Sequence, residues 1–270
     1  MRIRKIAVLI DGGFYLKRLK KWPEIDRDSP TAVANAARWM CKRHVQRLIR
    51  ERQGTRPSQW LDHVYRLFFY DARPYTGTPH HPLKNRQIDY GKTAEAKFRF
   101  TLFQEIRKQR KFALRLGHLK KFGDWTPYNH HMKRLLKIRE CADYLAQVLQ
   151  DSSKAEPDKT EDALRCLEAW QTLGDDDIQL PLRQKGVDMR IGLDITTMTL
   201  KRQVDTIVLV TGDSDFIPAA KIARREGVEF ILDPMWQSVE PDLMEHVDGI
   251  ASGLDRPGTA TIPRDDEDAQ

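Results

Sequence analysis

Residues 6–13 read Ile-Ala-Val-Leu-Ile-Asp-Gly-Gly, and this stretch predicts the fold of the chain. Five apolar residues, three of them β-branched, are typical of a strand that is buried on both faces. Asp11 ends the run, and the two glycines that follow predict a tight loop. A strand of this kind is typical of a parallel α/β sheet covered by helices.

Further apolar runs along the chain alternate with stretches of helical spacing. Strands are predicted at Val64–Tyr70, Phe112–Leu119, Thr206–Thr211 and Glu229–Leu232. Helices are predicted from Pro30 up to Gly54, over about 92–110, over about 187–202, and from Pro218 to Gly227. The alternation predicts a three-layer α/β/α sandwich around a central, mainly parallel sheet.

Residues 125–180 do not follow this alternation. Two helices are predicted there, over about 131–150 and 160–173, with a polar break between them. We interpret the segment as a helical insertion into a single domain that spans residues 1–254. Residues 255–270 are rich in proline, glycine and aspartate and are predicted to form a disordered acidic tail.

Charge is distributed unevenly over the 270 residues, whose net charge is +7. Residues 1–140 hold 33 lysines and arginines against 12 acids, whereas residues 141–270 hold 13 against 27. This asymmetry favours a first half that faces nucleic acid and an acidic half that holds a metal site or a solvated tail. Solvated helix faces are the alternative explanation.

Several classes of protein are disfavoured by composition. Apolar runs stay well below the ~18 residues of a membrane span, and the run at 6–10 is too short for a signal peptide, so we expect a cytoplasmic protein without membrane contact. The three cysteines (Cys41, Cys141 and Cys166) include no CxxC pair, which argues against a disulfide framework or a zinc knuckle.

Four aspartates are the candidate site. Asp11 follows the first strand, Asp213 and Asp215 follow the strand at 206–211, and Asp188 lies at the start of a helix. Because ligands bind beyond the carboxyl ends of parallel strands, we expect these acids to meet at one sheet edge. At ~4 Å each pair would repel by about 1 kcal/mol in water and ~4 kcal/mol at an effective dielectric constant of 20. A divalent cation, Mg²⁺ or Mn²⁺, would neutralise them. As an alternative, each acid could cap a helix or close a turn.

Several sequence blocks together resemble a known family. These blocks are Ile10-Asp11-Gly12-Gly13-Phe14-Tyr15, Lys185-Gly186-Val187-Asp188, Asp194, Thr211-Gly212-Asp213-Ser214-Asp215-Phe216, Ile222–Val228 and Leu232-Asp233-Pro234. They are similar to the NYN domain of the PIN-like nuclease superfamily, in its bacterial LabA-like type. The resemblance covers most of the chain except residues 125–180 and the tail.

The resemblance carries expectations about activity. It implies a PIN-like sandwich and Mg²⁺- or Mn²⁺-dependent cleavage of RNA, with Asp11, Asp188, Asp213 and Asp215 as metal ligands and catalytic residues. Asp194 matches a recurring acid of the family, and its contact with metal stays open. Hydrolysis by a metal-activated water would leave 5′-phosphate and 3′-hydroxyl ends.

Basic and aromatic residues near these acids are candidates for contact with nucleic acid. Lys17, Arg18, Lys20, Lys21, Lys185 and Arg190 could hold phosphates, and Tyr15 and Tyr75 could stack on unpaired bases. Thr211 and Ser214 could orient the metal ligands. Asp71, at the end of another predicted strand, could join the acids or cap a loop.

The expected function is a metal-dependent ribonuclease that acts on single-stranded RNA. Two alternatives stay open: a non-catalytic module of the same fold that binds RNA or a protein partner, and a nuclease that cleaves DNA in defence. RNA is preferred to DNA on the family resemblance alone. A homodimer is compatible with the sequence.

Overall fold

The structure is a computed structural model, which describes residues 3–53 and 57–259. The chain divides into two compact units. The first consists of Met1–Thr76, Gly91–Leu119 and Gln184–Gln270, and the second of Gly77–Tyr90 and Lys120–Arg183. Within the described residues, no helix is both long enough and apolar enough to cross a membrane.

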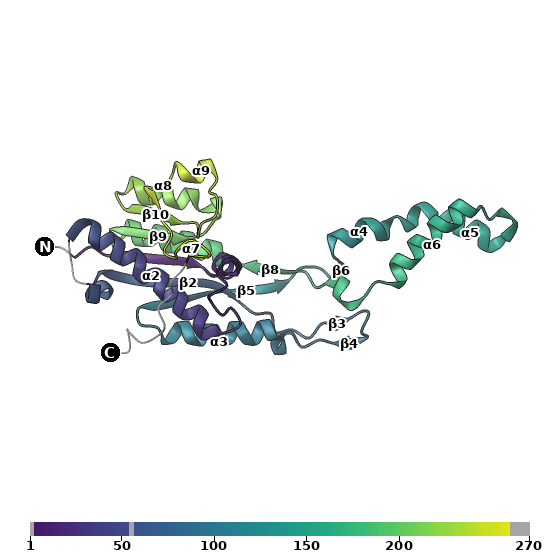
Figure 1. Cartoon of the computed structure of the whole chain (residues 1–270), viewed down its shortest axis with the longest axis horizontal. Helices are drawn as coiled ribbons and strands as arrows, with labels where there is room; N and C mark the ends of the chain where they lie inside the picture. Colours follow the sequence, from purple (N-terminus) through teal and green to yellow (C-terminus); the bar gives the residue numbers. More distant parts are fainter. Residues whose placement is uncertain (1–2, 54–56, 260–270) are drawn as a thin grey trace. The chain divides into compact units, whose positions relative to one another are not determined.

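The first unit contains most of a seven-stranded sheet (Figure 1), with the order β11-β10-β9-β1-β2-β5-β8. The strands are β1 (Ile6–Asp11), β2 (Val64–Arg73), β5 (Phe112–Lys121), β8 (Leu182–Lys185), β9 (Thr206–Val210), β10 (Glu229–Asp233) and β11 (Gly249–Ile250). All pairings from β11 through β5 are parallel. The mainly parallel α/β sheet expected from the sequence is therefore confirmed.

Side chains of β1 alternate between the two faces of this sheet. Ile6, Val8 and Ile10 pack in one core with residues of α2 (Pro30–Gln53) and α3 (Ala94–Lys108). Ala7 and Leu9 pack in a second core with residues of α7 (Val187–Leu200) and α8 (Ile217–Arg225). Because each face of β1 is covered in this way, its five apolar residues are all fully buried, and the first unit is an α/β/α sandwich.

Strand register brings distant residues to one edge of the sheet. Asp11 is paired with Tyr70 of β2, Ile10 is paired with Val210 of β9, and Asp233 of β10 is paired with the same Val210. The carboxyl ends of these four strands therefore lie next to one another.

Shorter elements complete the first unit. They are α1 (Gly12–Arg18), α9 (Pro241–Met244) and the 3₁₀ turns η1 (Leu19–Lys21), η2 (Pro57–His63), η3 (Tyr90–Lys92) and η6 (Ser214–Phe216). The prediction of a tight loop after Asp11 is wrong, because α1 begins directly at Gly12. The prediction that the second strand ends at Tyr70 is also wrong, since β2 continues to Arg73 and includes Asp71.

Three helices form most of the second unit: α4 (Asn129–Leu136), α5 (Ile138–Gln150) and α6 (Pro157–Gln171). The helix expected over 131–150 is two helices that meet at Lys137. The unit also holds the turns η4 (Ser152–Lys154) and η5 (Asp175–Asp177) and two small antiparallel ladders, β3 (His80–His81) with β4 (Arg86–Gln87) and β6 (Thr126–Pro127) with β7 (Ile178–Gln179). Residues 77–90 thus belong to this unit.

Most of the predicted tail cannot be compared with the structure, because residues 260–270 lie outside the described part. At its start, the backbone carbonyl of Asp255 accepts a hydrogen bond from Trp22 Nε1 at 2.9 Å. The Asp255 carboxylate also forms an ion pair with Arg43 at 2.6 Å.

Candidate active site

Asp11 stands at the junction of β1 and α1 and is held by two hydrogen bonds. Its Oδ1 accepts from the backbone N–H of Phe14 at 3.2 Å, which makes Asp11 the N-cap of α1. Its Oδ2 accepts from the hydroxyl of Thr211 at 3.3 Å. Glycine is required at position 12, because a Cβ there would lie 2.5 Å from the backbone oxygen of Tyr70.

Thr211 connects Asp11 to the second pair of acids. Besides donating to Asp11, its buried hydroxyl oxygen accepts the backbone N–H of Asp213 at 3.2 Å. Asp213 Oδ1 in turn accepts the backbone N–H of Asp215 at 2.9 Å. The side chains of Asp213 and Asp215 are both exposed. One hydroxyl group thus links the ends of β1 and β9.

Asp188 lies in the first turn of α7, after Gly186, whose φ of 76° starts the helix from a left-handed conformation. Partial burial raises the pKa of Asp188, and the negative charges of Asp213 and Asp215 raise it further. Because these charges act on Asp188, the three carboxylates lie within electrostatic range of one another.

Asp11 belongs to the same electrostatic group. Burial raises the pKa of Asp11 to about 6, against the lowering effect of the Phe14 N–H, and the negative charge of Asp188 adds to the increase. None of these four aspartates forms an ion pair with a lysine or arginine of the described residues. The edge therefore carries negative charge that no described cation of the chain neutralises.

The donor set fits a hard divalent cation, since it consists of carboxylate oxygens. As the side chains stand, however, no three His, Cys, Asp or Glu groups among the described residues are arranged closely enough to hold a metal ion. The described carboxylates are thus near neighbours that do not form a closed ligand shell.

Asp194 is engaged elsewhere. Its Oδ2 accepts the hydroxyl proton of Tyr70 at 2.9 Å and forms an ion pair with Arg115 Nε at 3.1 Å. The Tyr70 ring is buried, so this contact joins α7 to β2 across the second core.

Asp71 is also bound in the structure and joins no ligand set there. Its buried carboxylate forms an ion pair with Arg99 of α3 and accepts the backbone N–H of Ala72 at 2.7 Å. Burial raises the pKa of Asp71, and the positive charge of Arg99 opposes that increase. The role as a loop cap is wrong, because Asp71 lies inside β2. Its negative charge does raise the pKa of Asp11, so Asp71 lies within electrostatic range of the candidate acids while it is paired with Arg99.

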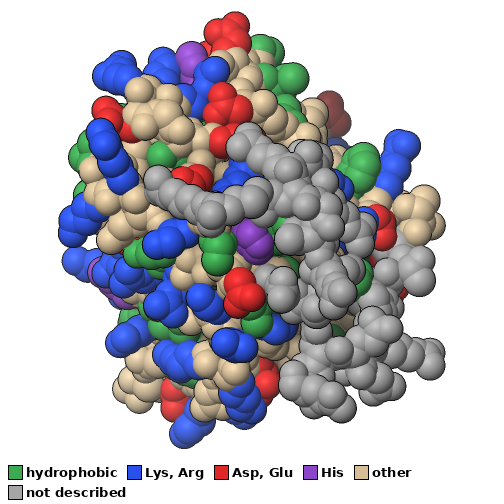
Figure 2. All heavy atoms as spheres, turned by 90° about the vertical axis from the view of Figure 1, so that its left-hand side faces the viewer, with side chains coloured by type: hydrophobic (Ala, Val, Ile, Leu, Met, Phe, Trp, Pro, Cys, Tyr) green, Lys and Arg blue, Asp and Glu red, His purple; other side chains and the backbone are tan. Residues whose placement is uncertain are grey.

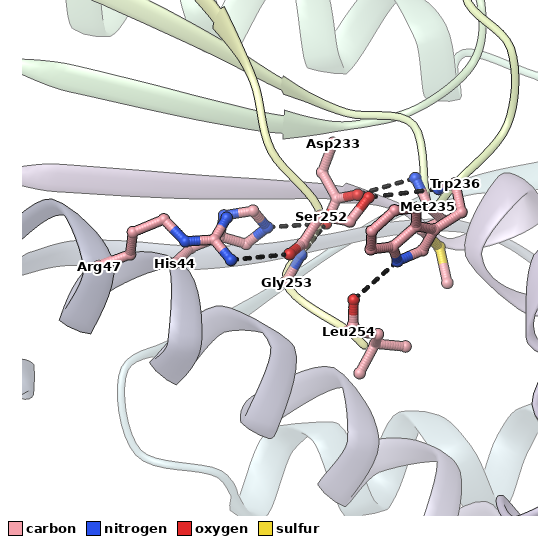
Figure 3. Close-up of polar contacts among 8 residues, drawn as sticks. All are labelled: His44, Arg47, Asp233, Met235, Trp236, Ser252, Gly253 and Leu254. Atoms are coloured by element: carbon pink, nitrogen blue, oxygen red, sulfur yellow. Dashed lines mark hydrogen bonds and ion pairs between the residues drawn. The ribbon is translucent and has the colours of Figure 1, made fainter. Parts of the chain in front are cut away.

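Asp233 ends β10 at the same edge, and its carboxylate is saturated by hydrogen bonds (Figure 3). It contacts His44 Nε2 at 2.7 Å, the N–H of Met235 at 2.7 Å and the N–H of Gly253 at 2.9 Å. The acid is fully buried. Although it belongs to one of the blocks that resemble the family, it joins α2, β10 and the segment after β11.

The predicted nucleic-acid contacts fall into three groups. Lys17, Lys20, Lys21 and Lys185 are exposed and form no ion pair within the described chain. Two arginines are bound to backbone oxygens, Arg18 to that of Met235 at 2.6 Å and Arg190 to that of Gly186 at 2.6 Å. The prediction that Tyr15 stacks on bases is wrong, because its side chain is fully buried and its hydroxyl donates to the Val33 oxygen at 2.9 Å.

Ser214 lies in η6 between the two exposed acids and is half-buried. Within the described residues its side chain forms no hydrogen bond to either of them, so the support expected from Ser214 is supplied by Thr211 instead.

Positive charge is not confined to this edge. Figure 2 shows a side of the molecule over which lysine and arginine side chains are widely spread. Arg107 and Lys108 close α3, and Arg224 and Arg225 close α8, in the turns that lead to the amino ends of strands. Basic residues alone therefore do not single out one site, and the carboxylates without cationic partners are the more specific candidate.

Comparison with known proteins finds one family model that matches part of the chain. Residues 145–250 match the model of the NYN domain. This part of the chain is therefore similar to an NYN domain. The NYN family belongs to the PIN-like nuclease superfamily. The matched region of the NYN domain includes Asp188, Asp213 and Asp215, whereas Asp11 precedes it.

One solved structure is similar to this chain at low identity. It is a crystal structure of a protein of unknown function from Vibrio parahaemolyticus, with 14% identity, 93% of this chain and 94% of that chain covered, and a TM-score of 0.39. No curated protein matches the chain.

Proposed function

We propose that the chain is a divalent-metal-dependent ribonuclease that hydrolyses single-stranded RNA at the carboxyl edge of its sheet. The observation that carries the proposal is a group of four aspartates without basic partners in the described structure, in which Asp188 interacts repulsively with the other three, in a chain that resembles the NYN domain over residues 145–250. In a protein that only bound nucleic acid, such uncompensated negative charge would lower the affinity for phosphates.

Asp11, Asp188, Asp213 and Asp215 are the residues that would hold Mg²⁺ or Mn²⁺. Such an ion supplies neutralisation of the phosphodiester charge and an acidified water at neutral pH. Thr211 orients two of these acids at once, through its bonds to the Asp11 carboxylate and to the backbone of Asp213. Lys185, exposed beside Asp188 in the sequence, would contact the RNA backbone through phosphate.

The test is cleavage of 5′-labelled single-stranded RNA by the purified chain with Mn²⁺, Mg²⁺ or EDTA. We expect cleavage with either metal, none with EDTA, and 5′-phosphate and 3′-hydroxyl products. Products with 2′,3′-cyclic phosphate would contradict the proposal, because they arise from attack by the ribose hydroxyl. Cleavage of matched single-stranded DNA but not RNA would show a deoxyribonuclease instead.

Asp213→Asn is the decisive variant. We expect at least a hundredfold loss of cleavage with equal or higher thermal stability, since the substitution removes one repelling charge from an exposed position. Asp242→Asn, an exposed acid of α9, is the matched control and should retain full activity. RNA binding without cleavage by the wild-type chain under all these conditions would favour the non-catalytic alternative.

A further inference from the structure

A groove of about 640 Å³ opens beside the candidate site, within the first unit. It lies between α1, the segment from η1 to the start of α2, and the first turns of α3. Gly13 is part of its wall, and a Cβ at this residue would lie 3.4 Å from Asp11 Oδ1. Gly13 thus belongs both to the groove and to the surroundings of the Asp11 carboxylate, and the volume of the groove is in the range of pockets that hold small organic ligands.

Cations dominate the polar part of the groove. Lys17, Lys20 and Arg27 are exposed there and form no ion pair with another described residue. Arg99 is neutralised by Asp71 and by Glu95, which it contacts at 2.9 Å. Asp28 is the remaining acid of the lining. The groove thus has an excess of positive charge, which suits a polyanion.

The floor of the groove is apolar and includes one aromatic ring. Leu16 and Phe98 are partly buried against the core that β1 shares with α2 and α3, and both line the groove. An acidic peptide would gain affinity from the lysines, but it does not in general use an aromatic ring. A nucleotide uses both the cations and the ring, because its phosphate contacts cations while its base stacks on an aromatic face.

We infer that this groove holds an unpaired nucleotide of the RNA next to the scissile phosphate, with phosphates on Lys17, Lys20 and Arg27 and the base on Phe98. The inference rests on the proposed function for the identity of the ligand. It adds a physical reason for a preference for single strands, since a base paired in a duplex cannot be placed in the groove. Arg27 and Phe98 lie in separate segments of the chain, and no sequence motif indicates that they share a site.

The experiment is fluorescence anisotropy of a labelled ten-nucleotide oligouridylate with the full chain in EDTA, so that binding is separated from cleavage. We expect the double variant Lys17→Gln/Lys20→Gln to bind at least tenfold more weakly, with a smaller salt dependence, because two phosphate contacts are lost. The matched control is Lys201→Gln/Arg225→Gln, which removes the same charge from exposed, unpaired residues of the described chain near the amino ends of β9 and β10. It should change binding by less than twofold.

Phe98→Leu tests the base contact, because it keeps an apolar side chain while removing the flat ring. Binding of oligouridylate should weaken about five- to tenfold, whereas binding of an abasic oligonucleotide of equal length should not change. Circular dichroism and the melting temperature of the variant show whether it stays folded with leucine at this partly buried position.

Three outcomes would overturn the inference: equal losses for both double variants, oligouridylate binding unaffected by Phe98→Leu, or competition by polyglutamate as strong as by RNA. The last result would identify an acidic peptide as the ligand. Groove-dependent binding without cleavage in Mn²⁺ would refute the proposed function, while the groove would still be shown to bind an unpaired nucleotide. Cleavage with an unchanged KM in the groove variants would refute the inference and leave the function intact.

Discussion

At the scale of single residues, Asp11 has a structural role and a proposed chemical one. It caps α1 through the Phe14 N–H, and it contributes a buried negative charge to the candidate site. The first role favours folding, whereas the second opposes it, because burial disfavours the ionised form. This conflict can be measured through the pH dependence of stability.

The pKa of Asp11 is about 6 in the folded chain, above its ordinary value of 3.8. Well below pH 3.8 the carboxyl is protonated in both the folded and the unfolded state and has no effect on stability. As pH rises through 6 it ionises at a cost in the folded state, so stability of about 2–3 kcal/mol is lost. In EDTA, Asp11→Asn should therefore gain stability relative to wild type between pH 4.5 and pH 7.5, since asparagine also caps helices well.

Urea unfolding at the two pH values measures this difference. The exposed residue Asp242 provides the control, and Asp242→Asn should show a difference from wild type that does not vary with pH in this way. An Asp11→Asn variant whose relative stability is the same at both pH values would show that the carboxyl is not desolvated as described.

The ion pair of Asp71 and Arg99 shows the cost of a buried charge at the same scale. Arg99→Met would leave the Asp71 carboxylate buried without its cation, and we expect a loss of about 3 kcal/mol at pH 7. Lys108→Met removes the exposed contact with Glu105 at 2.6 Å and should cost less than about 1 kcal/mol. Similar losses for the two variants, measured by urea unfolding, would contradict the burial of Asp71.

At the scale of elements, the loops at the strand ends are held together by Asp233. This one carboxylate accepts hydrogen bonds from the turn after β10 and the segment after β11, and it contacts His44 of α2 (Figure 3). Trp236 strengthens the same junction, because its Nε1 donates to the Leu254 oxygen at 2.9 Å. The segment that follows β11 is thus anchored by buried polar contacts.

Asp233→Ala should loosen this junction. Two buried N–H groups and His44 would lose their acceptor, and each unsatisfied group costs about 1–3 kcal/mol. Hydrogen exchange should accelerate over residues 249–255, and the chain should lose at least ~3 kcal/mol of stability. Asp255→Ala is the comparison: it removes the ion pair with Arg43 but keeps the backbone bond to Trp22, so exchange should change little. Equal exchange in the two variants would argue against a central role of Asp233.

At the scale of the whole molecule, the chain consists of two units with separate interiors. The three helices of the second unit pack through residues such as Ala163, which is fully buried, and Trp170 Nε1 donates to the Leu135 oxygen at 3.0 Å. The Cys141 and Cys166 sulfur atoms lie 3.7 Å apart where α5 contacts α6. None of these contacts involves the sheet.

Local disruption of the second unit should therefore leave the sheet folded. Ala163→Asp places a charge in a fully buried position of α6, so hydrogen exchange should accelerate over residues 129–171. Protection of β1 and β9 should stay within a factor of two of wild type. Loss of protection in both regions together would show a single cooperative unit, in line with the single domain predicted for residues 1–254.

Much of the sheet could be predicted from the sequence because its signals are local. Strands buried on both faces need continuous apolar runs, and β1, β9 and β10 lie within two residues of their predicted bounds. Helical spacing likewise located α2, α3 and α7. The break at Lys137, the immediate start of α1 and the continuation of β2 through Asp71 escaped prediction, since each depends on contacts with distant residues.

By itself, the sequence determined the parallel α/β fold and placed acids at the ends of its strands, because apolar runs and chain order are written in neighbouring residues. Tertiary structure alone decided how each acid is used. Asp233 is saturated by backbone N–H groups, Asp71 is paired with Arg99, and Asp194 is bound to Tyr70. The acids without a cationic partner in the described chain are Asp11, Asp188, Asp213 and Asp215. The physical reason is that a carboxylate's role depends on its burial and its hydrogen-bond donors, which come from segments up to two hundred residues away.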